Sequence, residues 1–187
     1  MLNINKTIGV TVISKFKNVY QGKVINLGIE SIILPNGEPC DLELIKHPGG
    51  AVAVAINDQQ QVCLLHQYRH ATGGWLWELP GGRIESGESP LLSIQRELRE
   101  EAGVEASQWR PLIEVWSTPG FCTEKLYLFV AEGLTQHESQ LEVDEVIEVH
   151  WIDLTQAMAM CASGEIVDAK TLIGLYRLQH DAHEQPG

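Results

Sequence analysis

Six glutamates lie in or beside one short segment of the chain, residues 81–105. They are Glu85, Glu88, Glu97, Glu100, Glu101 and Glu105. Two carboxylates about 5 Å apart repel each other by roughly 3 kcal/mol at an effective dielectric constant of about 20. Either these side chains spread into solvent, or a cation lies among them and relieves the repulsion. Carboxylate and carbonyl oxygens are hard ligands, which suit Mg²⁺ or Mn²⁺ rather than Zn²⁺.

The spacing of the glutamates places three of them on one side of a predicted helix. Glu97 and Glu101 are four residues apart and share a face, which Glu100 borders. A solvent-exposed face with ion pairs to arginines is the ordinary interpretation of such a pattern. The Pro-Gly-Gly sequence of residues 80–82 favours a ligand site instead, because glycine lets the backbone approach a ligand closely.

The same segment has a longer set of residues at fixed spacing. Gly82 is followed after five residues by Glu88 and, after seven more, by Arg-Glu-Leu-Arg-Glu-Glu-Ala-Gly-Val at residues 96–104. At every defined position this resembles the box of the Nudix hydrolase superfamily, G-x5-E-x7-R-E-U-x-E-E-x-G-U, in which U is a bulky aliphatic residue. The resemblance implies an enzyme that cleaves a diphosphate linked to another moiety, with divalent metal ions held on this loop and helix.

Roles for the box residues follow from this resemblance. It makes Glu97 and Glu101 the principal metal ligands, with Glu100 as a further ligand or catalytic support and the carbonyl of Gly81 completing the shell. The resemblance also counts Arg96 among the catalytic residues, because it would orient the glutamates by ion pairing. The ion, Mg²⁺ with Mn²⁺ as the alternative, would lower the pKa of a bound water and so produce the nucleophile.

A second motif narrows the branch of the superfamily. Residues 117–124, Ser-Thr-Pro-Gly-Phe-Cys-Thr-Glu, resemble the S-P-G-x-x-x-E signature of ADP-ribose pyrophosphatases, with Thr118 in the usual place of serine. An ordinary turn between two strands is the alternative interpretation. The resemblance makes Pro119, Gly120 and Glu124 substrate-binding residues.

The general base and the phosphate ligands are less sharply defined by the motifs. By similarity to a late strand of the family, Glu145 takes the position of base or metal ligand, and Glu142 is its rival. Arg69 matches a phosphate-contacting arginine of related enzymes, and Arg83 follows the box glycine. A bidentate guanidinium suits a diphosphate. Both arginines are equally compatible with an ordinary place on the surface.

Strands and helices alternate along the chain after a β-rich start. The segments with strand patterns are 7–16, 23–34, 40–47, 51–57, 61–68, 110–116, 125–133 and 144–153. We expect 51–57 and 61–68 to pair as a hairpin of buried strands. Start and stop residues predict helices over 90–102, 154–163 and 169–180, the last capped by Asp168.

This order of elements predicts an α+β fold, and the resemblance makes it a mixed α/β/α Nudix sandwich with an N-terminal antiparallel β extension. Residues 1–47 would form a β-rich region for dimerisation and substrate binding. Residues 48–187 would form the hydrolase domain. In the ADP-ribose branch the N-terminal region commonly packs across a two-fold axis, so the resemblance implies a homodimer.

The composition of the chain argues against several classes of protein. Its 187 residues, 44% of them hydrophobic and 20% charged, suit a globular domain with a small appendage. The formal charge of −12 and the absence of a basic stripe argue against nucleic-acid binding. No apolar run approaches the roughly 20 residues of a membrane span, so we expect no membrane association.

The cysteines and the N-terminus indicate the compartment. Cys40, Cys63, Cys122 and Cys161 are scattered without a Cys-x-x-Cys pair, which argues against zinc or a disulfide framework. The first twenty residues lack the charged-then-apolar layout of a secretory signal. We therefore expect a cytoplasmic protein.

The predicted activity is metal-dependent hydrolysis of the diphosphate bond of ADP-ribose or a related nucleoside diphosphate sugar, giving a nucleoside monophosphate and a sugar phosphate. GDP-mannose or another nucleoside diphosphate hexose is the alternative substrate. A non-hydrolytic module that senses ADP-ribose is a third hypothesis. The retention of every box glutamate argues against it, because such modules generally lose them.

Overall fold

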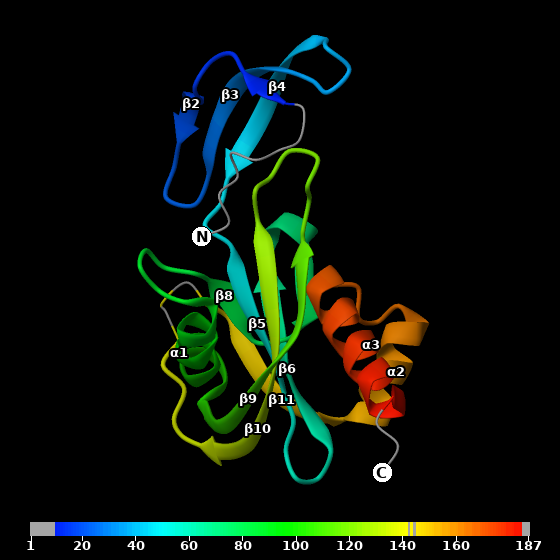
Figure 1. Ribbon diagram of the computed structural model, residues 1–187. Coiled ribbons are helices and arrows are strands. Elements are labelled where there is room, and N and C mark those ends of the chain that lie inside the picture. The colour runs from blue at the N-terminus through cyan, green and yellow to red at the C-terminus, as the bar shows by residue number, and fades with distance from the viewer. Residues whose placement is uncertain (1–9, 142, 144, 185–187) are drawn as a thin grey trace. The chain divides into compact units, whose positions relative to one another are not determined.

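The computed structural model describes residues 10–141, 143 and 145–184 (Figure 1). The chain forms two compact units. One consists of Met1–Pro48 together with Trp116–Glu124, and the other of Gly49–Val115 together with Lys125–Gly187. The division at residue 47 that the sequence suggests assigns residues 116–124 to the later domain, whereas the structure assigns them to the first unit.

The first unit contains an antiparallel sheet of four short strands. They are β1 (Thr11–Val12), β2 (Lys17–Gln21), β3 (Asn26–Ile33) and β4 (Pro39–Lys46). Strand β3 pairs with each of the other three. The predicted strand over residues 7–16 is only Thr11–Val12 in its described part, and β2 is a strand that the sequence reasoning missed.

Residues 116–124 run beside the end of β4 inside this unit. The amide of Ile45 donates to the carbonyl of Phe121 at 2.7 Å, and the amide of Thr123 donates back to the carbonyl of Ile45 at 2.9 Å. The amide of His47 also donates to Oγ1 of Thr123 at 2.9 Å. These bonds explain why the segment belongs to the first unit although it lies far along the sequence.

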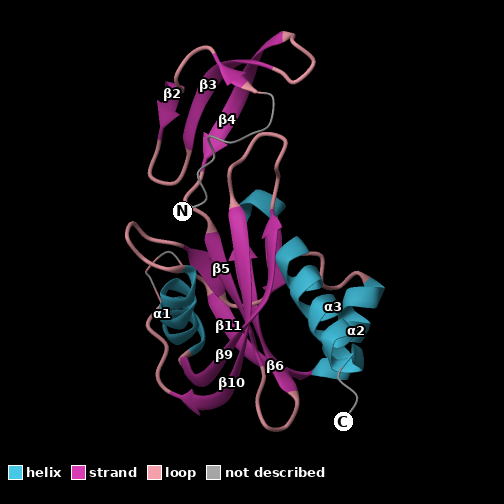
Figure 2. Ribbon diagram, in the orientation of Figure 1, coloured by secondary structure: helices cyan, strands magenta, loops and turns pink. Residues whose placement is uncertain are grey.

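The second unit is built on two sheets, which Figure 2 shows in magenta. One has the order β8 (Gly81–Arg83), β5 (Gly50–Ala55), β10 (Lys125–Gln136) and β9 (Val104–Trp116). The other has the order β11 (Ile147–Asp153), β6 (Gln61–Arg69) and β7 (Gly74–Glu78). Strands β5 and β10 are parallel, whereas the pairs β5–β8, β6–β7 and β6–β11 are antiparallel.

The predicted hairpin of residues 51–57 and 61–68 is wrong. Strand β5 lies between β8 and β10 in one sheet, whereas β6 lies between β11 and β7 in the other. A strand has two edges, and both edges of β5 are already paired, so β6 has no place beside it. The chain only turns there, with a single bridge between Ile56 and Val62.

The helices follow their predicted boundaries closely. They are α1 (Pro90–Ala102), α2 (Leu154–Ser163) and α3 (Ala169–Glu184), with a short 3-10 turn η1 (His70–Thr72). Ser89 caps α1 by accepting the amide of Leu92, and Gly103 ends the helix in a left-handed conformation, φ 64°. Helix α3 is longer than the predicted range of 169–180.

The core of the second unit has two halves, one on each side of the sheets. Val52 and Val54 of β5 pack in a cluster with residues of α2 and α3, whereas Ala51 and Ala53 pack in a cluster with residues of α1. The alternation along one strand therefore serves two opposite layers. Figure 1 shows α1 on one side of the sheets and α2 and α3 on the other, which is the expected α/β/α sandwich.

Within the described residues, no helix combines the length and apolar character needed to cross a lipid bilayer.

Candidate active site

The loop that precedes α1 is in direct contact with the glutamates of that helix. The amide of Gly81 donates to Oε2 of Glu101 at 2.8 Å. A Cβ atom at Gly82 would lie 2.2 Å from Oε1 of Glu97. Only glycine lets the loop lie this close to the carboxylate. The Pro-Gly-Gly sequence and the glutamate helix therefore form one constellation.

Arg96 holds three glutamates around this loop. Its Nε and Nη2 both donate to the carboxylate of Glu88 at 3.2 Å. Its Nη1 donates to Glu97 at 2.9 Å and to Glu100 at 3.0 Å. Nη2 also lies 3.5 Å from the carbonyl oxygen of Arg83. The guanidinium thus fixes the side chains on the outer part of the acidic face.

Glu101 occupies the inner part of the acidic face, and within the described part of the chain no arginine or lysine is hydrogen bonded to its carboxylate. Its side chain is buried, with the residue only 3% exposed. Burial raises the pKa of Glu101 to about 8; the amide of Gly81 opposes the rise, while the charges of Glu97 and Glu145 add to it. Burial also raises the pKa of Glu97, and Arg96 partly opposes that rise.

Glu145 lies near enough to this pair to act on both. Its negative charge contributes to the raised pKa of Glu97 and of Glu101. The structure thus brings Gly81, Glu97, Glu101 and Glu145 to one place. Glu142, the rival candidate for the general base, lies outside the described residues.

Comparison with known proteins identifies the family. The model of the NUDIX domain matches residues 46–173, which is more than half of the chain. The chain belongs to the NUDIX domain family. The box that the sequence predicts is the segment whose contacts are described above.

The proteins similar to this Nudix chain include the following three, whose names state a function. A methanol dehydrogenase activator of Bacillus methanolicus is 34% identical over 167 residues, covering 88% of this chain and 90% of that protein. An ADP-ribose pyrophosphatase of Bacillus subtilis (strain 168) is 34% identical over 165 residues, covering 87% and 89%. A GDP-mannose pyrophosphatase of Citrobacter koseri is 36% identical over 141 residues, covering 70% and 73%.

A solved structure supports the fold. The crystal structure of an ADP compounds hydrolase superposes with a TM-score of 0.80 at 18% identity and covers 93% of this chain and 94% of that one. At this identity the likeness concerns the fold alone, and it confirms the predicted Nudix sandwich.

The acidic site suits a divalent cation, which Nudix hydrolases generally use. Carboxylate oxygens of Glu97 and Glu101 and the Gly81 carbonyl are hard donors, and a bound cation would offset the burial and the mutual repulsion that raise both pKa values. Among the described residues, no three His, Cys, Asp or Glu side chains already form a metal-binding group. Arg96 holds one carboxylate and the Gly81 amide holds the other, so binding an ion requires the two to close on it.

The two arginines proposed for the phosphates have different surroundings. Arg69 donates from Nε to Oε1 of Glu78 at 2.8 Å and from Nη2 to Oε2 at 3.1 Å, so it is anchored to a buried carboxylate. Its side chain is 42% exposed, and Nη1 lies outside this bidentate pair. Arg83 is exposed on β8, and its carbonyl oxygen accepts from Oγ of Ser93 at 3.3 Å.

The residues of the second motif, 117–124, lie in the first compact unit, whereas the glutamates of α1 lie in the second. Pro119 and Gly120 belong to a turn in which the carbonyl of Thr118 accepts the amide of Cys122 at 3.0 Å. Glu124 follows the turn, and its carboxylate lies 3.5 Å from Nδ1 of His47. The structure therefore supports a local turn and a close contact between His47 and Glu124 at this motif within the first unit.

The sequence did not predict a cluster of charged side chains around Glu78, which lies shortly before the Gly81–Gly82 loop. Glu78 accepts hydrogen bonds from Arg69 and from Lys170, which also bonds Asp168 at 3.0 Å. Burial alone would raise the pKa of Glu78, but the two cations outweigh it and hold the pKa below its usual value. The one local signal is the run Asp-Ala-Lys-Thr at residues 168–171, from which the sequence predicts only the helix cap at Asp168.

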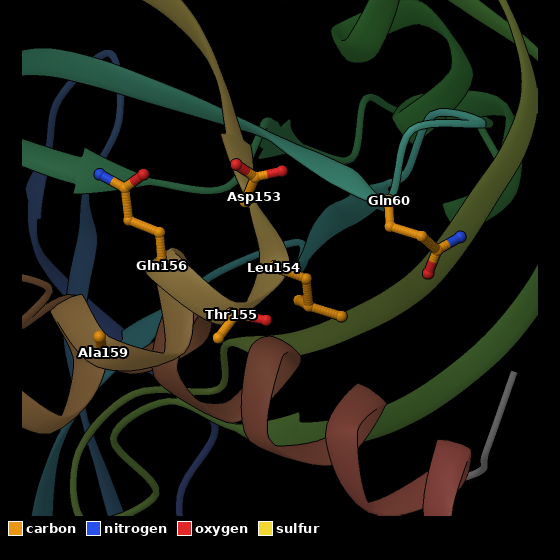
Figure 3. Close-up of a pocket in the computed structure, with 6 residues that line it drawn as sticks. All are labelled: Gln60, Asp153, Leu154, Thr155, Gln156 and Ala159. Atoms are coloured by element: carbon orange, nitrogen blue, oxygen red, sulfur yellow. The ribbon is translucent and has the colours of Figure 1, made fainter.

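A separate pocket, shown in Figure 3, lies at the start of α2. Its lining residues are Gln60, Asp153, Leu154, Thr155, Gln156 and Ala159. Of the described residues that line it, only Asp153 is ionisable, and none is a predicted site residue. The pocket offers no group of residues for phosphate or metal chemistry, so the acidic face of α1 remains the candidate active site.

Proposed function

We propose that this Nudix chain hydrolyses the diphosphate bond of ADP-ribose or a related nucleoside diphosphate sugar, with Mg²⁺ as the ion and Mn²⁺ as a substitute. The products are a nucleoside monophosphate and a sugar phosphate. The observation that carries the proposal is the pair Glu97 and Glu101, both with raised pKa values, with Glu101 bonded to the Gly81 amide and Glu97 packed against Gly82. The name of the B. subtilis relative supports the choice of substrate.

The chain's own residues divide the work of this reaction. Glu97, Glu101 and the Gly81 carbonyl hold the divalent ion, which when bound neutralises phosphate charge and lowers the pKa of a coordinated water. Arg96 keeps Glu97 in place. Glu100, held by the same guanidinium, is a further ligand or support. Glu145 takes the proton from the attacking water.

Binding of the substrate relies on cations and on the second motif. Arg69, anchored by Glu78, presents Nη1 to the diphosphate, and Arg83 is a second candidate for that contact. Pro119, Gly120 and Glu124 are assigned to the sugar nucleotide by their resemblance to the family signature. Glu142 keeps its place as the alternative to Glu145 for the general base.

The test is a substrate panel with the purified chain and Mg²⁺. We expect the highest kcat/KM for ADP-ribose, with AMP and ribose 5-phosphate as products. Failure to cleave ADP-ribose and every nucleoside diphosphate sugar of the panel would contradict the proposal. Nucleotide binding by the wild-type chain without turnover would favour the sensing module instead.

GDP-mannose is the second candidate substrate. The C. koseri relative, a GDP-mannose pyrophosphatase, covers 70% of this chain at 36% identity. A higher kcat/KM for GDP-mannose than for ADP-ribose in the same panel would establish this alternative. The acidic site serves both reactions, because both cleave a diphosphate beside a divalent ion.

The proposal includes a homodimer formed through the N-terminal β region, residues 1–47. Apolar side chains on the first unit are exposed in the single chain, namely Val12, Ile13, Val19, Tyr20, Val24 and Ile25. A dimer interface would remove such surface from water. Light scattering coupled to size exclusion should give twice the 20.8 kDa mass of the chain. The four cysteines have free thiols, which fits the proposed cytoplasmic location.

A further inference from the structure

The first turn of α3 forms a hydrogen bond with Leu79, which directly precedes the Pro80-Gly81-Gly82 loop. Oγ1 of Thr171 accepts the amide of Leu79 at 2.8 Å, although the two residues are 92 positions apart. Thr171 is fully buried and Leu79 is 1% exposed. A buried amide without a partner would cost about 1–3 kcal/mol, so this bond fixes where Leu79 lies.

Asp168 sets the direction of that bond. Its Oδ2 accepts the backbone amide of Thr171 at 3.0 Å and the hydroxyl of Thr171 at 2.7 Å. Because the hydroxyl hydrogen is donated to Asp168, a lone pair of Oγ1 faces the amide of Leu79. The helix cap and the loop contact are therefore one continuous arrangement.

Lys170 extends the arrangement to Arg69. Its ammonium group bonds Oδ1 of Asp168 at 3.0 Å and also the carboxylate of Glu78. Glu78 in turn holds Arg69 through both of its oxygens. Two cations and two anions balance, and the pair of bonds to Glu78 leaves the guanidinium of Arg69 one orientation.

Three consecutive residues after Glu78 are each held by a different layer of the sandwich. The amide of Leu79 is held by α3. The carbonyl of Pro80 accepts the amide of Ala53 of β5 at 2.9 Å. The amide of Gly81 donates to Glu101 of α1 at 2.8 Å. The backbone that presents the Gly81 carbonyl is thus fixed from both sides of the sheets.

We propose that Thr171, Asp168 and Lys170 are positioning residues of the Nudix site. Thr171 and Asp168 fix residues 79–81, so that the Gly81 carbonyl and the Glu101 carboxylate face the same ion. Lys170 holds Glu78, and Glu78 orients Arg69 toward the diphosphate. This inference rests on the proposed function, because it assigns these residues to the metal and the phosphates of that reaction.

Attachment of α3 to the sheets does not require these polar residues. Leu175 and Leu178 of α3 are buried in the core cluster that also contains Leu79 and Leu128. Valine at position 171 would fill the same volume as threonine without accepting the amide of Leu79. The hydroxyl therefore supplies position rather than packing, and the two contributions are separable by experiment.

The experiment measures Mn²⁺ binding without substrate, by the electron paramagnetic resonance signal of free Mn²⁺, in full-length variants. Thr171→Val should weaken Mn²⁺ binding by about 10- to 100-fold, the range typical of outer-shell groups, while Thr171→Ser should stay within about threefold of wild type. Wild-type Mn²⁺ affinity in Thr171→Val would overturn the inference. Wild-type protein that binds Mn²⁺ but cleaves no nucleotide sugar would contradict only the proposed function.

A second variant separates positioning from general destabilisation. Lys170→Met should raise KM for the nucleotide sugar by about tenfold and leave Mn²⁺ affinity within about threefold, and Lys170→Arg should restore KM. A purely structural role would shift both quantities together. If Thr171→Val fails to fold, the Lys170 pair decides, because a wild-type KM in Lys170→Met contradicts the inference.

Discussion

Glu78 and Glu101 are two glutamates of the same unit with the same exposure, 3% each, and opposite electrostatic surroundings. Glu78 has Arg69 and Lys170 bound to its carboxylate, and its pKa is held low although burial opposes this. Glu101 receives a backbone amide and lies near two other carboxylates, and burial raises its pKa to about 8. The comparison shows that Glu78 is satisfied by the protein itself, whereas Glu101 is satisfied only when a proton or a cation joins it.

The difference follows from what each carboxylate faces. A buried charge without a partner costs several kcal/mol, so a chain that keeps one either neutralises it or binds a counterion. At Glu78 the counterions are side chains from β6 and α3. At Glu101 no side chain of the described residues is hydrogen bonded to the carboxylate, and the backbone amide of Gly81 donates to it. This is the pattern expected of a structural acid and of a metal ligand, respectively.

Removing a carboxylate from the acidic face should have the largest effect. Glu97→Gln and Glu101→Gln keep the shape of the side chain and lose the charge that holds the ion. We expect kcat/KM for ADP-ribose to fall on the order of 10³-fold or more, because the site loses a metal ligand and not only an outer-shell contact.

Glu165→Gln is the matched control for these variants, since Glu165 is exposed and lies outside the site. It should retain wild-type kcat/KM. Glutamine variants at 97 and 101 that keep a tenth or more of the activity would mean that the acidic face does not hold the catalytic ion.

Closing the space between the loop and the helix should have the next largest effect. In Gly82→Ala the added methyl group would lie 2.2 Å from the Glu97 carboxylate, so that side chain must move away. We expect Mn²⁺ affinity and activity to fall by about 10- to 100-fold. Gly74→Ala is the control, because a Cβ at Gly74 meets no atom within 4 Å. Equal Mn²⁺ affinities in the two alanine variants would contradict the close approach.

The sequence predicts the surroundings of Glu101 but not those of Glu78. Glu97 and Glu101 lie within one helix, so the spacing and the caps at Ser89 and Gly103 suffice to place them together. Glu78 and Lys170 are 92 residues apart, and their contact depends on how α3 docks on the sheets. No local pattern encodes that distance, so the cluster required the structure.

The failed hairpin has the same physical origin. Residues 51–57 and 61–68 are both apolar runs separated by a turn, which is the local pattern of a hairpin. Strand β5 pairs instead with β8 and β10, and β6 with β7 and β11, and of these β10 and β11 lie much later in the chain. The pairing of each run depends on strands that come later in the chain. The residues of the turn between the two runs hold no information about those strands.

The same substitution at the two buried acids should act differently on stability. Glu78→Gln leaves Arg69 without its carboxylate partner and Lys170 with Asp168 alone, so we expect a loss of about 3 kcal/mol in the free energy of unfolding and a melting temperature lower by roughly 6–12 °C. Glu101→Gln keeps an acceptor for the Gly81 amide and removes only a charge that burial disfavours. Its metal-free melting temperature at pH 8 should equal or exceed that of wild type, and equal losses in both variants would contradict the comparison.

The stability of the metal-free protein should also change with pH. The ordinary pKa of 4.5 is raised to about 8 in Glu101, so between these values the unfolded chain has lost a proton that the folded chain keeps. Wild-type stability should therefore decline through this window relative to Glu101→Gln, and the difference should level off above about pH 8. Thermal scans at pH 5, 6.5 and 8 without metal should show the gap between the two melting temperatures widening at each step. Saturating Mg²⁺ should reverse it at pH 8, because only the ionised wild-type carboxylate binds the ion. A gap that stays constant with pH would mean that Glu101 is ionised in the folded chain without a cation, and would remove the contrast with Glu78.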